Sequence, residues 1–167
     1  MKSLFFNRIP KIFILGFLFL GFTSCSNQVS DELSYYINKQ LTKVAEKESE
    51  AIDLFDSVTG NNFTDDETMY FTLQNDVIPV YSDFITQLES ISAELETEEV
   101  QKVHEKYIEG ANIQNNGFVL VLSALESNDR TLMAQANEKL AKGRKLMRNF
   151  KSDLKKLCKE NNVELIN

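Results

Sequence analysis

The chain has 167 residues, with 18 basic and 25 acidic side chains and a formal net charge of −7 at pH 7. This acidic balance argues against nucleic acid as a partner, because binding phosphate groups requires a basic surface. One histidine and two cysteines leave little material for a histidine-rich metal site or a disulfide framework.

The first 25 residues have the layout of a secretory signal. Three basic residues precede a short apolar run at 12–22, and small polar residues follow it. The run is shorter than the roughly 20 apolar residues of a membrane-spanning helix. Its end, Phe-Thr-Ser-Cys at 22–25, resembles the bacterial lipobox, in which a small residue precedes a lipidated cysteine. The resemblance implies cleavage after Ser24 and a thioether-linked diacylglycerol, with acyl chains such as palmitate, on Cys25.

A lipidated Cys25 divides the chain into a signal peptide at 1–24, a tether at 25–30 and a domain at 31–167. Two acyl chains hold firmly to a bilayer, at about 0.8 kcal/mol per buried methylene. We therefore expect the domain at the extracytoplasmic face of the cell membrane. The three basic residues leave with the signal, so the remaining 143 residues have 15 bases, 25 acids and a net charge of −10.

Apolar residues at spacings of three and four predict a first helix at 31–58. Ser30 can cap this helix and Gly60 can end it. Glu48 stands where the next apolar residue of the stripe is expected.

The second helix begins with a capping box at 64–67, Thr-Asp-Asp-Glu, in which the first and last side chains satisfy each other's free amides. Its apolar stripe extends to Leu95. Pro79 lies in the middle, where its ring clashes with the carbonyl group of Asn75 in a regular helix. Because the stripe keeps its phase across Pro79, we expect one helix with a kink.

A third helix is expected at 98–126, capped by Thr97, and a fourth at 129–160. Gly110 and Gly117 allow another helix to approach the third one closely. No stretch has the alternation of a strand. Four long helices with short connections predict an all-α fold, an antiparallel up-down-up-down four-helix bundle whose second helix is kinked at Pro79.

The sequence offers few groups for metal or nucleophilic chemistry. Di-metal bundles use Glu-x-x-His on two helices, whereas the single histidine, His104, has Gln101 three residues before it. We expect His104 at the surface or boundary of its helix, and neither a metal nor a cofactor. Cys158 is interpreted as a half-buried apolar residue, and alternatively as a thiol whose pKa the neighbouring lysines lower.

One layer of the predicted bundle combines Pro79, Gln114 and Gly143 at the same height. In the structural interpretation, Gln114 donates a hydrogen bond to the carbonyl group freed by Pro79, because a buried amide needs a partner. In the functional interpretation, the layer holds a small polar pocket lined by Tyr81, Tyr107 and Gln114.

Charge is distributed unevenly along the chain. Residues 64–126 have a net charge of −11 and residues 129–160 a net charge of +6. The fourth helix is therefore expected to lie against acidic neighbours. Its second half should also return to the anchored end, opposed in part by the acidic turn at 94–99. A basic patch there would attract an anionic bilayer, and its members are Arg148, Lys151, Lys155, Lys156 and Lys159.

The chain resembles small helical lipoproteins of Gram-positive bacteria in its FTSC motif, its helical layout and the segments VTGNNFTDDETMYFTLQNDVIPVYSDF and ANEKLAKGRKLMRNF. The resemblance implies a cell-envelope location and no reaction. We therefore expect a membrane-anchored binding or interaction module rather than an enzyme, with an envelope protein or a small ligand as its partner. The alternatives are an envelope enzyme that uses Cys158 or the Gln114 layer, and a small-ligand sensor with a pocket in that layer.

Overall fold

The computed structural model describes residues 23–164. Over this range the chain is all-helical and contains no strand, which confirms the all-α prediction. The first long stretch consists of α1 (Thr23–Tyr35), the π-helical segment η1 (Tyr36–Leu41) and α2 (Thr42–Asp56). After the short 3₁₀ turn η2 (Gly60–Asn62), the second consists of α3 (Asp66–Thr72), the π-helical segment η3 (Leu73–Val77) and α4 (Ile78–Ser92). The third and fourth are α5 (Glu98–Ser127) and α6 (Arg130–Glu160).

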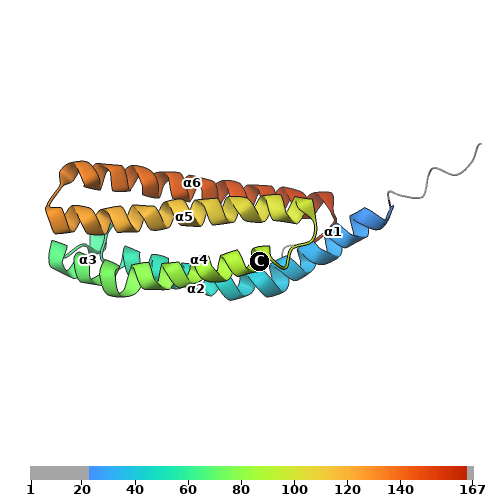
Figure 1. Ribbon diagram of the computed structural model, residues 1–167, viewed down its shortest axis with the longest axis horizontal. Helices are drawn as coiled ribbons and strands as arrows, with labels where there is room; N and C mark the ends of the chain where they lie inside the picture. Colours follow the sequence, from blue (N-terminus) through green and yellow to red (C-terminus); the bar gives the residue numbers. More distant parts are fainter. Residues whose placement is uncertain (1–22, 165–167) are drawn as a thin grey trace, which may run out of the picture.

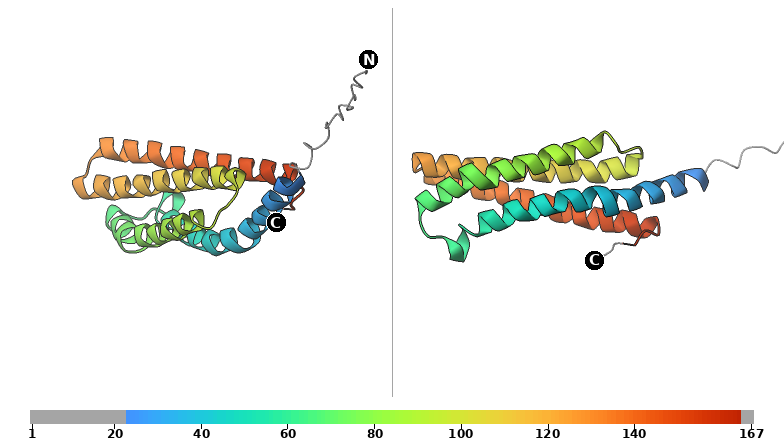
Figure 2. Two further views of the ribbon diagram at one scale, coloured as in Figure 1. Left: turned by 45° about the vertical axis from the view of Figure 1, so that its right-hand side comes forward. Right: turned by 90° about the horizontal axis from the view of Figure 1, so that it is seen from below.

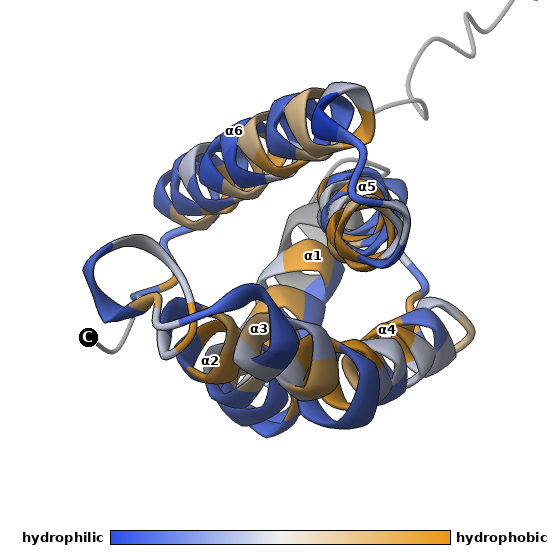
Figure 3. Cartoon of the chain, turned by 90° about the vertical axis from the view of Figure 1, so that its left-hand side faces the viewer, coloured by the Kyte–Doolittle hydropathy of each residue, from blue (hydrophilic) through white to orange (hydrophobic). Residues whose placement is uncertain are grey.

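The long helices lie lengthwise beside one another (Figure 1). α5 packs against α6 along its length, α2 packs against α4, and α4 also packs against α5. Two further views show α1, the α4–α5 connection and the end of α6 gathered at one end of the molecule (Figure 2). Seen along the long axis, apolar residues colour the inward faces and hydrophilic residues the outward faces (Figure 3). The predicted apolar stripes therefore form one common core.

The first helix begins earlier than the sequence predicts. α1 starts at Thr23, so the helix covers residues 25–30, where a tether was expected. Val29 is buried one turn before the buried Leu33, and this packing gives the earlier turns a reason to stay helical. Ser30 lies inside the helix, where its carbonyl group accepts a hydrogen bond from the Ser34 hydroxyl at 2.8 Å.

The cap of α3 also differs from the prediction. Asp65, and not Thr64, is the capping residue, and its carboxylate accepts a hydrogen bond from the backbone N–H of Thr68 at 2.7 Å. The Thr68 hydroxyl donates to the same carboxylate at 3.0 Å. These bonds hold the pKa of Asp65 below its usual range. The Thr-Asp-Asp-Glu box was wrong by one residue because Asp65 is itself a good cap.

α5 is capped by another helix. Thr97 is its capping position, as predicted, but its side chain does not bond to α5. Instead Glu32 of α1 accepts hydrogen bonds from the Thr97 backbone N–H at 2.9 Å, from the Thr97 hydroxyl and from the Glu96 backbone N–H. A carboxylate suits this position, because free N–H groups make the start of a helix positive.

The second long stretch continues through Pro79, as predicted, and the π-helical segment η3 lies directly before it. A π turn adds one residue and shifts the carbonyl groups that would otherwise meet the proline ring. The η1 segment has a different effect on the first stretch. It places Tyr36 and Gln40 in the core, whereas the apolar neighbours Ile37 and Leu41 are only partly buried.

Glycines let α5 and α6 approach closely, as the sequence predicted. A Cβ atom added at Gly143 would lie 2.9 Å from the Cβ of Gln114, and one at Gly117 would lie 2.6 Å from a methyl carbon of Leu140. Only a residue without a side chain fits at such distances. This approach fixes Gln114 against the backbone of α6.

Candidate functional site

A cleft of about 280 Å³ opens between α2 and α6. These helices are not among the closely packed pairs of the described chain, and Figure 3 shows them on the same side, apart from each other. The wall that α2 provides consists of Glu48, Ile52, Phe55 and Asp56. This wall is apolar in its middle, with a carboxylate near each end.

The floor of the cleft comes from α5. Phe118 is fully buried, and its ring lies 4.8 Å from that of Phe55 and 5.1 Å from that of Tyr81, measured between centroids. Gln114 also lines the cleft, although only 5% of its surface is exposed. Its side chain thus faces the cleft from a nearly buried position.

The predicted pairing of Gln114 with the carbonyl group of Asn75 was wrong. No hydrogen bond joins the two, and within residues 23–164 the Gln114 amide has no side-chain or backbone partner. The packing explains this result. Gln114 packs closely against Gly143 of α6, whereas Asn75 belongs to η3, which directly precedes α4 in the chain. Gln114 is thus one of the predicted pocket residues that lines the cleft.

The opposite wall of the cleft is basic. Arg144, Arg148 and Lys151 of α6 line it together with the apolar side chains of Leu140 and Met147. The three basic residues follow at spacings of four and three, which places them on one face of the helix. All three are exposed, and none belongs to an ion pair found among the described residues.

Glu48 is held at the edge of the cleft by Tyr107. The Tyr107 hydroxyl donates a hydrogen bond to the Glu48 carboxylate at 2.6 Å. The Tyr107 ring is buried and stacks on Phe150, with 4.2 Å between centroids and 9° between the ring planes. Burial and the Glu48 charge raise the pKa of Tyr107 well above its usual value, so it stays a donor. This bond explains why Glu48 interrupts the apolar stripe.

Tyr81, the third predicted pocket residue, lies in the core and does not line the cleft. Its side chain is fully buried and its hydroxyl has no hydrogen-bond partner. Burial, with a smaller contribution from the Glu48 charge, raises the pKa of Tyr81. The structure therefore brings Gln114 to the cleft directly and Tyr107 through Glu48, and leaves Tyr81 behind the floor.

His104 is a buried residue, so its predicted position at a surface or boundary was wrong. It is 1% exposed, and its Nε2 atom lies 2.9 Å from the carbonyl oxygen of Leu88. A carbonyl group only accepts, so Nε2 carries the proton and Nδ1 accepts from the Tyr36 hydroxyl at 2.9 Å. Burial lowers the pKa of His104, and both ring nitrogens are already used.

A signal for the burial of His104 was present in the sequence. His104 lies four residues after Val100 and three before Tyr107, and these three positions share one helix face. Its partner could not be found in this way, because Tyr36 belongs to another helix.

Cys158 is a free cysteine with 2% of its surface exposed. Burial raises the pKa of its thiol, so the alternative of a thiol whose pKa is lowered by the neighbouring lysines gains no support. Those lysines, Lys155, Lys156 and Lys159, are exposed and point their charge into water rather than at the thiol. Cys158 is an apolar member of the core.

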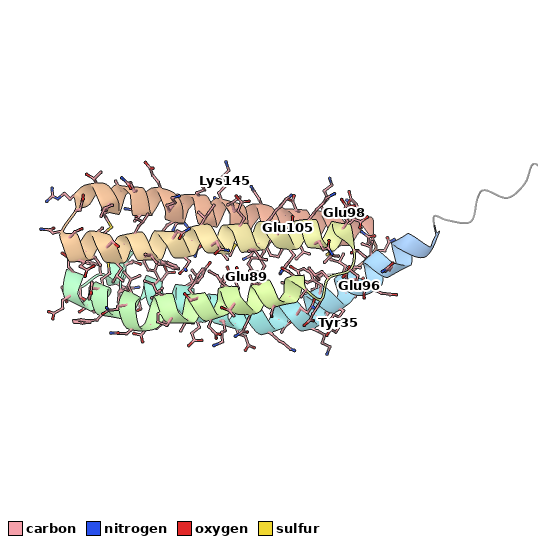
Figure 4. The ribbon with its side chains drawn as sticks, in the orientation of Figure 1. Tyr35, Glu89, Glu96, Glu98, Glu105 and Lys145 are labelled. Carbon is pink, nitrogen blue, oxygen red and sulfur yellow. The ribbon has the colours of Figure 1, made fainter. Side chains whose placement is uncertain are left out.

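The predicted basic patch is divided between two places. Arg148 and Lys151 line the cleft, whereas Lys155, Lys156 and Lys159 follow towards the end of α6, beside α1. Lys156 lies 3.8 Å from the Glu160 carboxylate. Figure 4 shows Glu96 and Glu98 at this same end, so its charge is mixed.

The predicted cleavage and lipidation site, Ser24 and Cys25, falls in the first turn of α1. The apolar run that precedes it lies outside the described residues. Within 23–164, no helix has the length and apolar character needed to cross a bilayer. In the same range, no three histidine, cysteine or acidic side chains lie close enough together to hold a metal ion.

Comparisons with protein-family models, with curated proteins and with solved structures find no match to this chain.

Proposed function

We propose that the chain is a membrane-anchored, extracytoplasmic helical lipoprotein that acts as a binding module, and that the cleft between α2 and α6 is its binding site. The observation that carries this proposal is Gln114. It lines the cleft with only 5% of its surface exposed, and no hydrogen bond joins its amide to another group of residues 23–164. Because the amide faces the cleft, it can donate to or accept from a ligand group that enters there.

The proposed anchor rests on the sequence at 1–25 and on the direction of the helices. The proposal includes an antiparallel up-down-up-down bundle with a kink at Pro79, supported by the short connections between successive helices. The Glu32 cap, which joins α1 to the start of α5, supports the same arrangement. Cys25 would then hold one end of the bundle at the bilayer, while the cleft opens on its side, further along α2 and α6.

The enzyme alternative gains no support from Cys158, because burial raises the pKa of its thiol and thiolates are the reactive form. The small-ligand sensor would use the same cleft, so the binding experiment applies to both interpretations.

The binding proposal is tested with benzyl alcohol, a neutral probe with an apolar ring and one hydroxyl group. The full lipidated chain is placed in phosphatidylcholine nanodiscs and titrated while backbone amides are followed by NMR. We expect saturable shifts at Ile52, Gln114, Phe118 and Met147, which line the cleft. Shifts spread evenly over the helices, or none at the cleft, would contradict the proposal.

The anchor is tested separately by expressing the full chain in a bacterial host with labelled palmitate. We expect the label and the protein in the membrane fraction. The C25A variant should carry no label and leave that fraction. An unlabelled wild-type chain would contradict the lipoprotein part of the proposal and leave the cleft unaffected.

A further inference from the structure

We infer that the ligand of the α2–α6 cleft is a small amphiphilic anion, a carboxylate or phosphate group on a compact apolar body. This inference rests on the proposed function and adds the chemical class of the ligand.

The basic wall supplies the first reason. Arg144 and Arg148 lie one helical turn apart, and Lys151 follows on the same face. Guanidinium groups match carboxylate and phosphate oxygens in geometry and can form two parallel hydrogen bonds with them. No carboxylate of the described chain forms an ion pair with any of the three, although the chain is acidic overall. Acidic residues elsewhere on α5 and α6 do pair with lysines, as Asp153 does with Lys106 at 2.5 Å.

The acidic residues of the cleft do not cancel this wall. One oxygen of the Glu48 carboxylate already accepts a hydrogen bond from the Tyr107 hydroxyl. Asp56 is exposed at the end of α2, where water screens it. The cleft therefore has three basic groups and two carboxylates, and one of these carboxylates already accepts a hydrogen bond.

The floor supplies the second reason. Phe118 of the floor packs against Phe55 of the α2 wall, with 4.8 Å between ring centroids. Together with Ile52 and Leu140 of the two walls, these rings give the cleft an apolar lining. An inorganic anion would leave this surface without a partner, whereas an apolar body covers it. The volume of about 280 Å³ lies at the small end of ligand pockets, which span about 300–1,000 Å³. It suits a single ring or a short branched chain.

Gln114 supplies the third reason, because it lines the cleft with only 5% of its surface exposed, and its amide bonds to no other group of residues 23–164. Its N–H₂ group can donate to an anionic oxygen that the arginines also hold. The apolar body of the ligand would lie on the Phe55–Phe118 side.

The experiment compares four probes with the same aromatic ring: benzoate, phenyl phosphate, benzyl alcohol and benzylamine, which is a cation at pH 7. Each is titrated into the full lipidated chain in phosphatidylcholine nanodiscs at about 0.15 M salt, with the cleft amides followed by NMR. We expect benzoate or phenyl phosphate to bind at least tenfold more tightly than benzyl alcohol, and benzylamine to bind most weakly. The comparison of the two anions separates a carboxylate from a phosphate ligand.

Two variants with the same loss of charge locate the effect. R144Q/R148Q removes the two arginines of the cleft wall, and we expect it to lower benzoate affinity at least tenfold and benzyl alcohol affinity much less. K142Q/K145Q is the matched control, because both residues are exposed on α6 and neither lines the cleft. Figure 4 shows Lys145 on the outer side of α6.

The outcomes separate the two proposals. Equal binding of all four probes at the cleft would overturn the anion inference and leave the binding module intact. An equal loss of benzoate affinity in K142Q/K145Q would also overturn it, because the effect would then be the overall charge of the helix. No cleft shift with any probe, benzyl alcohol included, would overturn both.

Discussion

Two of the places where polar groups lie in this core differ in how those groups are paired. Near the α1 end, Tyr36, His104 and the carbonyl group of Leu88 form a chain of hydrogen bonds at 2.9 Å each, closed off from water. Further along, Tyr107 bonds to the half-buried Glu48, and the Gln114 amide lines the cleft. The enclosed Tyr81 hydroxyl of this place has no partner among the described residues. Only the second place opens into a cleft.

This difference distinguishes polar groups that stabilise the fold from polar groups that are available to a ligand. A fully paired polar group stabilises one arrangement of helices and has nothing left to offer a ligand. A polar group that faces open space keeps its hydrogen-bonding capacity for a ligand. We therefore assign the Tyr36–His104 pair to stability and the Gln114 layer to binding.

The largest effect is expected from removing the histidine. H104A leaves a cavity and takes away the partners of both the Tyr36 hydroxyl and the Leu88 carbonyl group, so we expect a loss of about 3 kcal/mol in the free energy of unfolding. Urea unfolding followed by circular dichroism measures it. H104Q is the control, because a glutamine can still donate to one partner and accept from the other. If H104A and H104Q lost the same stability, the paired bonds would not be the cause.

A matched pair of tyrosines sharpens the comparison. Tyr36 and Tyr81 are both fully buried, but only the Tyr36 hydroxyl is paired. We expect Y36F to cost about 1–2 kcal/mol, because it leaves His104 Nδ1 without a partner, and Y81F to be neutral or slightly stabilising. Thermal unfolding of both variants tests this. A larger loss for Y81F than for Y36F would reverse our view of the two places.

The buried Tyr36–His104 pair should also make the free energy of unfolding depend on pH. Burial lowers the pKa of His104 in the folded chain, so the unfolded chain binds a proton more readily. The contribution is fully present above the unfolded pKa of about 6.5 and is lost as pH falls below it. We expect wild-type stability to fall between pH 7 and pH 5 by more than that of H104Q, measured by urea unfolding. Parallel curves for the two proteins would remove His104 as the cause.

The smallest effect on stability is expected at the open place. Q114L replaces an unpaired amide by an apolar side chain of similar size, so we expect a gain of about 0.5–1 kcal/mol in the free energy of unfolding. The same variant should bind benzoate more weakly, because the ligand loses the amide. A loss of stability would mean that Gln114 has a structural partner after all.

Much of the fold could be predicted from local patterns. The four helical stretches and the close approach at Gly117 and Gly143 follow from residue types and their spacing. Backbone preferences and the 3.6-residue period act over a few residues, which is why they are visible in the sequence.

The candidate site could be predicted only in part. Gln114 was identified because an amide stands in an apolar stripe, and Tyr107 because it lies two turns earlier on the same face. The α2 wall and the role of Arg144 were missed, because nothing in a periodic pattern tells which two of four helices leave a gap. The burial of Tyr36 and Gln40 was missed as well, because the π-helical segment η1 adds one residue to the turn and moves both inward.

The sequence by itself determined that this chain is helical, where its helices turn and which faces they bury. The tertiary structure alone decided the partners of its polar groups. Tyr36 meets His104 across 68 residues of chain, Glu32 meets Thr97 across 65, and Glu48 meets Tyr107 across 59. Such pairs depend on how whole helices rotate and pack, and a helix face of period 3.6 specifies only that a side chain points inward and not what it meets.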